Sequence, residues 1–582
     1  MTLQATFCAT LVDEWARGGV THAVIAPGSR SAPLAIALIA DGRIEVHVRL
    51  DERSAAFFAL GIALESGAPV VVLTTSGTAA AELHAAVLEA DLARVPLIVA
   101  TADRPFELHR VGAPQTVEQA GLFGGAVRLA LDPGVPMAEA AGSWRSLASR
   151  LVLEAVASPR GPGPVHVNLA FRDPLVGRPD PLPPGRADGR PWHVVVADRM
   201  AGADSVEQFV ASLAAGRGVV VVGGPIDRGV DAALGAFAGA TGWPVIADPR
   251  AIRREVEAAV IAHADGILGS PVARTALAPE VVVHIGSPHA SKRLGTWCAQ
   301  LAGAGVRHLL IDPDGAFEDP DRAAALVLRT DPATLLRAAA TRLGTNGAAD
   351  PGWLRAWRDA DDAAAGAICD LVEAEPAPTE PGIARAIVGA VPDGSIVFTS
   401  SSMPVRDVEW FAAARNGAPR VLANRGANGI DGVTSTILGV ATSVAGSSTR
   451  VVGLLGDLAL LYDLSGLVFG TREAVPDATL VVIDNGGGGI FSFLPYPGVL
   501  DDDDFERAFA TPQRPDIAAT VRGLGHAVVE CTTTAEVADA VRAAAPGVTV
   551  VVVRTDRAAN VALHHRAERQ ITAAVEAALA QQ

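Results

Sequence analysis

Short runs of valine and isoleucine alternate with longer helical patterns along the first third of the chain. These runs lie in HAVIAPGSR, IEVHVRLDERS, PVVVLTTSG and PLIVATADRP. Parallel strands need a long crossover connection, usually a helix, so this alternation indicates a parallel sheet with helices between its strands. The last third repeats the order in GSIVFTS, RVLANRG, RVVGLLGD and ATLVVIDNGGGG. We therefore expect an α/β protein, with an ancient duplication as one hypothesis for the shared order.

Proline-rich segments divide the pattern into blocks. One runs from Arg172 to Trp192, and GTNGAADPG and EAEPAPTEPG mark a later boundary. A length of 582 residues suggests about three or four domains. We expect three consecutive, doubly wound, mainly parallel-sheet domains over residues 1–180, 190–345 and 350–582.

Composition restricts the partners of this chain. Charged residues make up 19% and apolar residues 49%, which fits a compact globular protein, and the formal net charge is -17. Nucleic acids and anionic membranes need a basic field, so we expect neither as a partner. No apolar run approaches the roughly 20 residues that span a bilayer.

Cysteine usage and the first residues predict the compartment. The cysteines form neither a CxxC pair nor a dense disulfide framework; they are Cys8, Cys298, Cys369 and Cys531. The opening MTLQATFCATLVDEWARGGV lacks a basic region followed by an apolar core. We expect a cytoplasmic protein.

Polar residues follow two strands of the last third at the points where the strands end. Asp457 closes GLLGD and Asn485 closes VVIDN, 28 residues later. Ligands bind beyond the carboxyl ends of parallel strands, so the two side chains can converge. A carboxylate, an amide oxygen and a backbone carbonyl, that of Gly487, suit Mg²⁺, with Mn²⁺ as an alternative. The run from Gly486 to Gly489 lets a diphosphate lie against backbone N–H groups.

This spacing resembles the diphosphate-metal motif of thiamine-diphosphate enzymes. The chain has Gly456-Asp457-Leu458 where Gly-Asp-Gly is common, and Asp-Asn where Asn-Asn is frequent. The resemblance implies thiamine diphosphate as the cofactor and a carboxylate against its aminopyrimidine ring. Glu52, at the predicted start of a helix in RLDERSAAFF, fills that role, although an acid there also suits a helix dipole. Further cofactor contacts implied by the resemblance are Pro27, Gly28, Ser29, Thr75, Gly77, Ser401, Met403, Gly429, Ile430, Gly488, Ile490 and Phe491.

Several segments narrow the resemblance to one family. APGSRSAPL, TADRPFEL, GSPHASKRL, NRGANGIDG and GDLALLYDL resemble the 2-succinyl-5-enolpyruvyl-6-hydroxy-3-cyclohexene-1-carboxylate (SEPHCHC) synthases of menaquinone biosynthesis. The resemblance implies decarboxylation of 2-oxoglutarate and 1,4-addition of the succinyl-semialdehyde equivalent to isochorismate. Arginine forks hold carboxylates, and the substrates carry four. The implied substrate residues are Arg30, Arg104, Gln115, Lys292, Arg293, Ser402, Arg406 and Arg425.

Assembly and a second cofactor also follow from the resemblance. Pyrimidine and diphosphate sites of this family face each other across two subunits, which implies a homodimer or a dimer of dimers. The middle block resembles a domain that holds FAD in some relatives. Its VVVVGGP lacks a full GxGxxG, so we expect neither FAD nor NAD.

Three alternatives remain at this stage. One is another thiamine-diphosphate carboligase or decarboxylase that acts on pyruvate. Pyruvate has no distal carboxylate for the predicted cationic residues to bind. A nucleotide-dependent dehydrogenase would need a dinucleotide fingerprint, and a catalytically silent thiamine-binding regulator would not need Glu52. Four residues receive no role from the sequence: Glu82, Pro114, His564 and His565.

Overall fold

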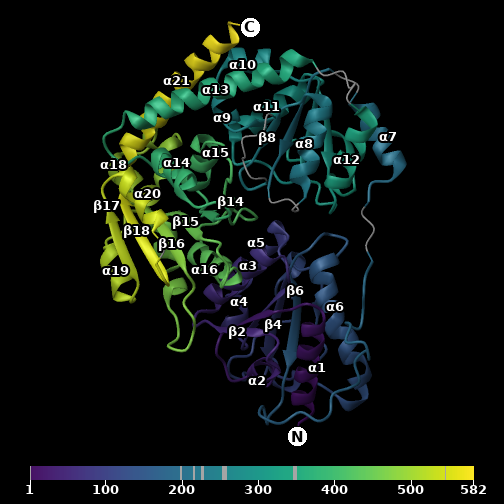
Figure 1. Cartoon of the computed structure of the whole chain (residues 1–582). Helices are drawn as coiled ribbons and strands as arrows, with labels where there is room; N and C mark the ends of the chain where they lie inside the picture. The colour runs from purple at the N-terminus through teal and green to yellow at the C-terminus, as the bar shows by residue number, and fades with distance from the viewer. Residues whose placement is uncertain are drawn as a thin grey trace.

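The structure is a computed structural model that describes residues 2–196, 200–213, 216–224, 229–251, 259–344, 350–543 and 545–581. Its strands form three six-stranded sheets in which every described strand pair is parallel. Helices cover the sheets, and the three sheets lie in separate regions of the molecule (Figure 1). The predicted α/β class with three mainly parallel sheets is confirmed.

The first sheet has the strand order β2-β1-β3-β4-β6-β5. Its strands are β1 (His22–Ile25), β2 (Glu45–Val48), β3 (Val70–Thr74), β4 (Leu97–Asp103), β5 (Ala130–Leu131) and β6 (Val165–Ala170). Its helices are α1 (Leu3–Arg17), α2 (Ala32–Asp41), α3 (Glu52–Ser66), α4 (Thr78–Ala81), α5 (His84–Ala93) and α6 (Trp144–Ala157).

The last sheet has the order β14-β13-β15-β16-β18-β17, the same as the first when its strands are counted from its own start. Its strands are β13 (Ile396–Thr399), β14 (Arg420–Leu422), β15 (Val451–Gly456), β16 (Ala478–Asp484), β17 (Ala527–Cys531) and β18 (Val548–Arg554). Its helices are α14 (Glu380–Ala390), α15 (Met403–Phe411), α16 (Val433–Ser443), α17 (Asp457–Tyr462), α18 (Asp502–Phe505), α19 (Ile517–Gly523), α20 (Thr534–Arg542) and α21 (Arg557–Leu579).

The middle sheet has a different order, β12-β11-β10-β7-β8-β9. Its strands are β7 (Gly218–Val222), β8 (Val245–Ala247), β9 (Val260–Ile261), β10 (Val281–Ile285), β11 (Arg307–Ile311) and β12 (Ala324–Leu328). Its helices are α7 (Ala203–Ser212), α8 (Val230–Thr241), α9 (Ala264–Ile267), α10 (Pro271–Ala276), α11 (Lys292–Gly303), α12 (Pro332–Leu343) and α13 (Pro351–Glu373).

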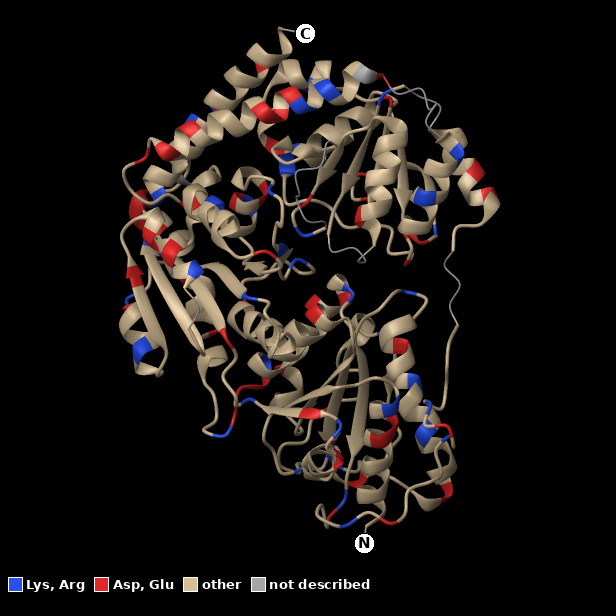
Figure 2. Ribbon diagram, viewed as in Figure 1, with Lys and Arg blue, Asp and Glu red and all other residues tan. Residues whose placement is uncertain are grey.

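Two helix pairs join the regions. Helices α3 and α16 pack so closely that a Cβ added at Gly61 would lie 2.1 Å from the Thr436 carbonyl oxygen, and one at Gly439 would lie 2.1 Å from that of Phe58. The apolar residues around this contact form one core shared by the first and last sheets. The C-terminal helix α21 lies along α13 beside the middle sheet (Figure 1), and both helices carry acidic and basic residues (Figure 2).

The structure agrees with some of the local predictions and not with others. The valine and isoleucine runs quoted for the first and last thirds coincide with strands, two of which, β2 and β14, lie at sheet edges. The strands β5, β6, β9, β12, β17 and β18 were not predicted. The acidic run Asp501–Asp504 supplies the cap and first turn of α18, where negative charges interact favourably with the helix dipole. The four cysteines are unpaired, and no described helix is both long and apolar enough to cross a membrane.

Candidate active site

The loops after β1 and β3 lie against each other at the carboxyl end of the first sheet. A Cβ at Gly28 would lie 2.3 Å from the Thr75 Cβ, so only glycine allows this approach. Gly77 has a φ of +86°, in the region that favours glycine, and its N–H donates to the Gln119 Oε1 at 2.9 Å. Pro27 and Ser29 flank Gly28 and are exposed. The predicted pyrimidine-side residues thus share one edge of the sheet.

A buried polar network fixes the Gly77 loop from below. The Gln119 Nε2 donates to the Asn168 Oδ1 at 3.0 Å, and the Asn168 Nδ2 donates to the Asp103 Oδ2 at 2.9 Å. Thr101 Oγ1 also donates to Asn168 Oδ1, at 3.0 Å. These side chains are all buried, so each lost bond would leave a polar group without a partner. The sequence analysis missed this network because its members are far apart along the chain.

Two predicted arginines lie close together at this edge. Arg30 donates from Nη1 to the Phe171 carbonyl at 2.9 Å, and its Nε is buried without a partner among the described residues. Arg104 donates to the Gln115 carbonyl at 2.8 Å, and burial together with the charge of Arg30 lowers the pKa of Arg104. Gln115 has a φ of +56° and turns its amide back to the Ser76 carbonyl at 2.9 Å. The neighbouring Pro114 is exposed.

Glu52 is the first residue of α3 and is half-buried. The capping role belongs to Asp51, whose side chain accepts from the Ser54 N–H at 3.0 Å. Among the described residues, the Glu52 carboxylate has no hydrogen-bond or ion-pair partner. Asp51 therefore takes the capping role, while Glu52 lies in the first turn, where its charge favours the helix dipole.

The last sheet carries the predicted metal motif at its carboxyl edge. Gly456 ends β15 and Asp457 begins α17. The Asp457 carboxylate accepts from the Leu458 N–H at 2.8 Å and from the Gly487 N–H at 2.7 Å. Burial, and to a lesser degree the charge of Asp484, raises the pKa of Asp457 to about 6 against these two bonds. A nearby cation would offset this cost of burying a carboxylate.

Asn485 follows the next strand, β16, and offers a free oxygen. Its Nδ2 donates to the Glu380 Oε1 at 2.8 Å. Its Oδ1 is buried and has no hydrogen-bond partner among the described residues. Because buried acceptors are normally satisfied, this oxygen fits the position of a cation ligand. The residues present therefore fit Mg²⁺ as the sequence predicted.

The glycine run after Asn485 packs too tightly for side chains. Gly487 has a φ of +126°, and a Cβ there would lie 2.0 Å from the Ala510 carbonyl oxygen. A Cβ at Gly488 would lie 2.7 Å from the ring of Phe491. Phe491 and Ile490 are half-buried, and the Phe491 ring meets that of Phe509 with centroids 5.6 Å apart.

A second cationic group lies at the ends of β13 and β14. Ser402 has a φ of +78° and accepts from Arg406 through its carbonyl, and the Arg425 Nη1 lies 3.4 Å from the Ser401 Oγ. Burial and the charges of Arg250 and Arg406 lower the pKa of Arg425 to about 10. Neighbouring positive charges favour a bound anion, although Asp248 and Glu409 already offset part of the charge of this group.

Other predicted members of this edge are placed nearby. Met403 is buried at the start of α15, while Gly429 and the half-buried Ile430 lie in the loop between β14 and α16. Arg425 also lines a cavity of about 1360 Å³ between the three sheets, together with Arg94 and Arg250. Arg250 was not predicted as a site residue, because its only signal in the sequence is a charged pair in IADPR at the end of β8.

The structure leaves Lys292 and Arg293 apart from the other cations. Both begin α11 of the middle sheet, and Lys292 is exposed. Arg293 is held by the Asp265 carboxylate at 3.2 Å and the Glu568 carboxylate at 2.7 Å. Besides the contact of Arg293 with Glu568 on α21, His289 in the preceding loop lies 3.1 Å from Glu409 on α15.

The residues without a predicted role also have clear positions. Glu82 and His565 are exposed. His564 lies 3.3 Å from the buried Asp407 carboxylate, with the rings of Phe411 and Phe493 around it. Glu380, which holds Asn485, was missed because its TEPG context reads as a linker; burial raises its pKa to about 7.

Comparison with known proteins decides the family. Residues 5–122 match the N-terminal TPP binding domain of thiamine pyrophosphate enzymes, residues 187–399 the middle domain and residues 409–554 the C-terminal TPP binding domain. A SEPHCHC synthase of Thermobifida fusca is 42% identical over 97% of this chain and 98% of its own length. The chain belongs to the SEPHCHC synthase family.

Further SEPHCHC synthases are similar over the same span. That of Myxococcus xanthus is 39% identical over 97% of this chain and 96% of its own, and that of Halobacterium salinarum is 41% identical over 96% of both. The predicted family is thereby confirmed. The first and last thirds are thiamine-diphosphate-binding domains, so the two sheet edges described above belong to cofactor-binding domains of the family.

Proposed function

We propose that the chain decarboxylates 2-oxoglutarate and adds the remaining four-carbon unit to isochorismate in a 1,4 fashion, giving SEPHCHC. Full-length similarity to SEPHCHC synthases supports this reaction. The structural observation that carries it is the buried, unpartnered Asn485 Oδ1 one strand away from Asp457. Both oxygens would hold Mg²⁺, or Mn²⁺, together with the Gly487 carbonyl. When bound, thiamine diphosphate supplies the electron sink for loss of carbon dioxide.

Glu52 is proposed to exchange a proton with the aminopyrimidine ring. Its freedom from hydrogen bonds and ion pairs in the described chain supports that role, because an acid already held by a cation would be a poor proton carrier. The loops of Gly28 and Gly77 would bring backbone close to the ring. Gly456, Leu458 and Gly488 would do the same for the diphosphate.

The arginines are proposed to hold substrate carboxylates. Arg30 and Arg104 form one group, and Arg406 and Arg425 form another. Each group brings half-buried positive charges near one another, and a substrate carboxylate would add to the stabilisation from nearby acids such as Asp173 beside Arg30. Gln115 and Ser402 would orient the bound substrates, while Ile490 and Phe491 exclude water. Roles for Lys292 and Arg293 have less support, because Arg293 already has two carboxylate partners.

We propose that the active unit is a homodimer or a dimer of dimers. Arg53 and Ser54, which follow Glu52, bind Tyr462 and Asp463 at the far end of α17 from Asp457. Within one chain, these contacts place the start of α3 beside the end of α17 rather than beside Asp457, which supports a site completed by a second copy. Light scattering of the purified protein tests this assembly.

The decisive experiment supplies purified protein with thiamine diphosphate, Mg²⁺, isochorismate and either 2-oxoglutarate or pyruvate. Mass spectrometry should find the succinyl-derived product only with 2-oxoglutarate. Product from pyruvate alone would keep the cofactor site and overturn the substrate assignment in favour of another carboligase.

Three further predictions complete the proposal. The domain limits are residues 1–180, 190–345 and 350–582, the middle domain binds neither FAD nor NAD, and the protein acts in the cytoplasm. Limited proteolysis between residues 180 and 190, a titration with each dinucleotide and cell fractionation test them in turn.

A further inference from the structure

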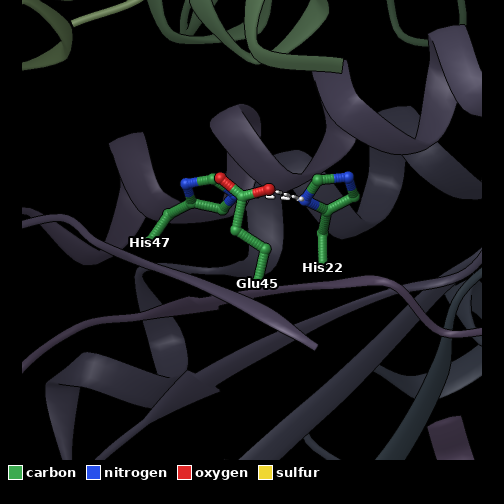
Figure 3. Close-up of side chains that lie close together, drawn as sticks. All are labelled: His22, Glu45 and His47. Carbon is green, nitrogen blue, oxygen red and sulfur yellow. Dashed lines mark hydrogen bonds and ion pairs between the residues drawn. The ribbon is translucent and has the colours of Figure 1, made fainter. Parts of the chain in front are cut away.

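A group of metal-ligating side chains lies at the opposite end of the first sheet from the cofactor loops. His22 begins β1, and Glu45 and His47 lie on the neighbouring edge strand β2. The register pairs His22 with Glu45 and Val24 with His47, so the three side chains project from one face. Figure 3 shows the Glu45 carboxylate between the two imidazole rings. His22 and Glu45 are the first residues of their strands and His47 is the third residue of β2, whereas Gly28 and Glu52 follow the carboxyl ends.

The distances fit one small cation. The His22 Nδ1 lies 3.1 Å from the His47 Nε2, and the Glu45 oxygens lie 3.8 Å from His22 and 3.9 Å from His47. Ligand bonds of about 2.0–2.2 Å at tetrahedral angles separate ligand atoms by roughly 3.3–3.6 Å. The Glu45 side chain is 66% exposed, so it can close the small remaining gap without moving the sheet.

We propose that His22, Glu45 and His47 bind a zinc-class divalent cation, with solvent in the fourth position. Two imidazole nitrogens favour Zn²⁺ over Mg²⁺, which prefers oxygen ligands. The ion would tie the edge strand β2 to β1. It is a separate site from the cofactor metal at Asp457.

The surroundings suit neutral imidazole ligands. Burial lowers the pKa of His22, and it lowers that of His47 to about 4. Arg49, two residues beyond His47, packs on the rings of Phe58 and Phe469, with guanidinium-to-centroid distances of 4.9 and 4.0 Å. Its charge also favours the neutral form of His47, whose ring contacts Phe58. The carboxylates of Asp463 and Glu473 offset part of the charge of Arg49.

Zinc binding to the full-length protein tests the proposal. The protein is first saturated with Mg²⁺ and thiamine diphosphate, and bound Zn²⁺ is then measured by equilibrium dialysis. We expect one Zn²⁺ per chain and a higher melting temperature. His22→Gln and His47→Gln should each weaken zinc binding by about 100-fold or more, since even supporting residues are worth about 10–100-fold.

Three variants make the outcome decisive. Glu45→Gln alters an exposed side chain, should fold normally and should weaken zinc binding about tenfold. His193→Gln, an exposed histidine bonded to Ser146, should bind zinc like the wild type. Asp457→Asn should also keep the zinc, even though it loses the cofactor metal. Absence of zinc binding in the wild type, unchanged binding in Glu45→Gln, or loss in Asp457→Asn would each overturn the proposal without affecting the proposed reaction.

Discussion

The first and last sheets share one strand order but secure their site loops in different ways. In the first sheet, β4 and β6 bury hydrogen-bonded polar residues beneath Gly77, among them Thr101, His166 and Asn168. In the last sheet, the corresponding strands β16 and β18 present an apolar core that includes Val551 and Val553. There the loop is held by the Asp457 and Asn485 side chains instead. The same strand order can thus support a site loop in two ways. Either polar side chains of the strands beneath the loop hold it, or side chains at the strand ends and in the loop itself do.

The middle sheet sharpens the contrast. Counted from its own start, its order is 3-2-1-4-5-6, the order of many dinucleotide-binding folds. Its two glycines after β7 are packed by protein: a Cβ at Gly223 would lie 1.5 Å from the Ser287 carbonyl oxygen, and one at Gly224 would lie 2.4 Å from the backbone of Arg250. This close packing of both glycines against protein backbone supports the proposal that the middle domain binds neither FAD nor NAD.

The largest effect is expected from replacing Glu52, which follows β2 of the first sheet. Glu52→Ala should lower the rate of carbon dioxide release by about 10³-fold, within the range of general acid–base catalysis. Metal-dependent cofactor binding should survive, because the metal ligands belong to the last sheet. Glu82→Ala, at an exposed glutamate, is the control. Decarboxylation at the wild-type rate in Glu52→Ala would contradict the role of Glu52.

The next effect concerns the last sheet's metal ligands. Asp457→Asn should weaken Mg²⁺-dependent thiamine diphosphate binding by about 100-fold, as should chelation of the metal from the wild type. Calorimetric titration of the cofactor with and without Mg²⁺ measures this. Asp503→Asn, at an exposed acid of α18, should bind normally. Equal affinities in Asp457→Asn and wild type would remove Asp457 from the metal site.

Two substitutions test the comparison directly: one removes a buried polar side chain from the first sheet, and the other adds one to the last sheet. Gln119→Leu leaves buried partners unsatisfied and should destabilise the protein by about 2 kcal/mol. It should also weaken cofactor binding, since Gly77 loses its acceptor. Val551→Thr buries an unpartnered hydroxyl in the last sheet and should cost a similar amount. Thermal unfolding and cofactor titration separate the two, because only Gln119→Leu touches the site loop.

The smallest effect is the contribution of His166, on β6 of the first sheet, to the pH dependence of stability. Burial lowers the pKa of His166 to about 4, so below about pH 6.5 the unfolded chain binds a proton that the folded chain refuses. Stability should therefore fall by about 1 kcal/mol between pH 7 and pH 5.5. Between pH 7 and pH 5.5, the melting temperature of His166→Gln should fall less than that of the wild type. Identical slopes would show that His166 does not set the acid sensitivity.

Much of the candidate site could be predicted because the end of an apolar run in the sequence marks the end of a strand. Asp457, Asn485 and Glu52 each follow an apolar run, and parallel strands bring such residues to one edge. The ion pair of Arg293 was harder to predict, since its partner Glu568 lies 275 residues away on α21. The short strands β5 and β9 have two residues each, too few to show a periodicity.

The sequence by itself determined the parallel sheets, the glycine loops and the chemistry available at each strand end, because these depend on neighbouring residues. Tertiary structure decided which polar groups are free to act. It leaves the Asn485 Oδ1 unpartnered but pairs Arg293 with Asp265 and Glu568, and it brings His22 beside His47. Such pairings depend on how distant strands and helices pack, and no local pattern along the chain carries that information.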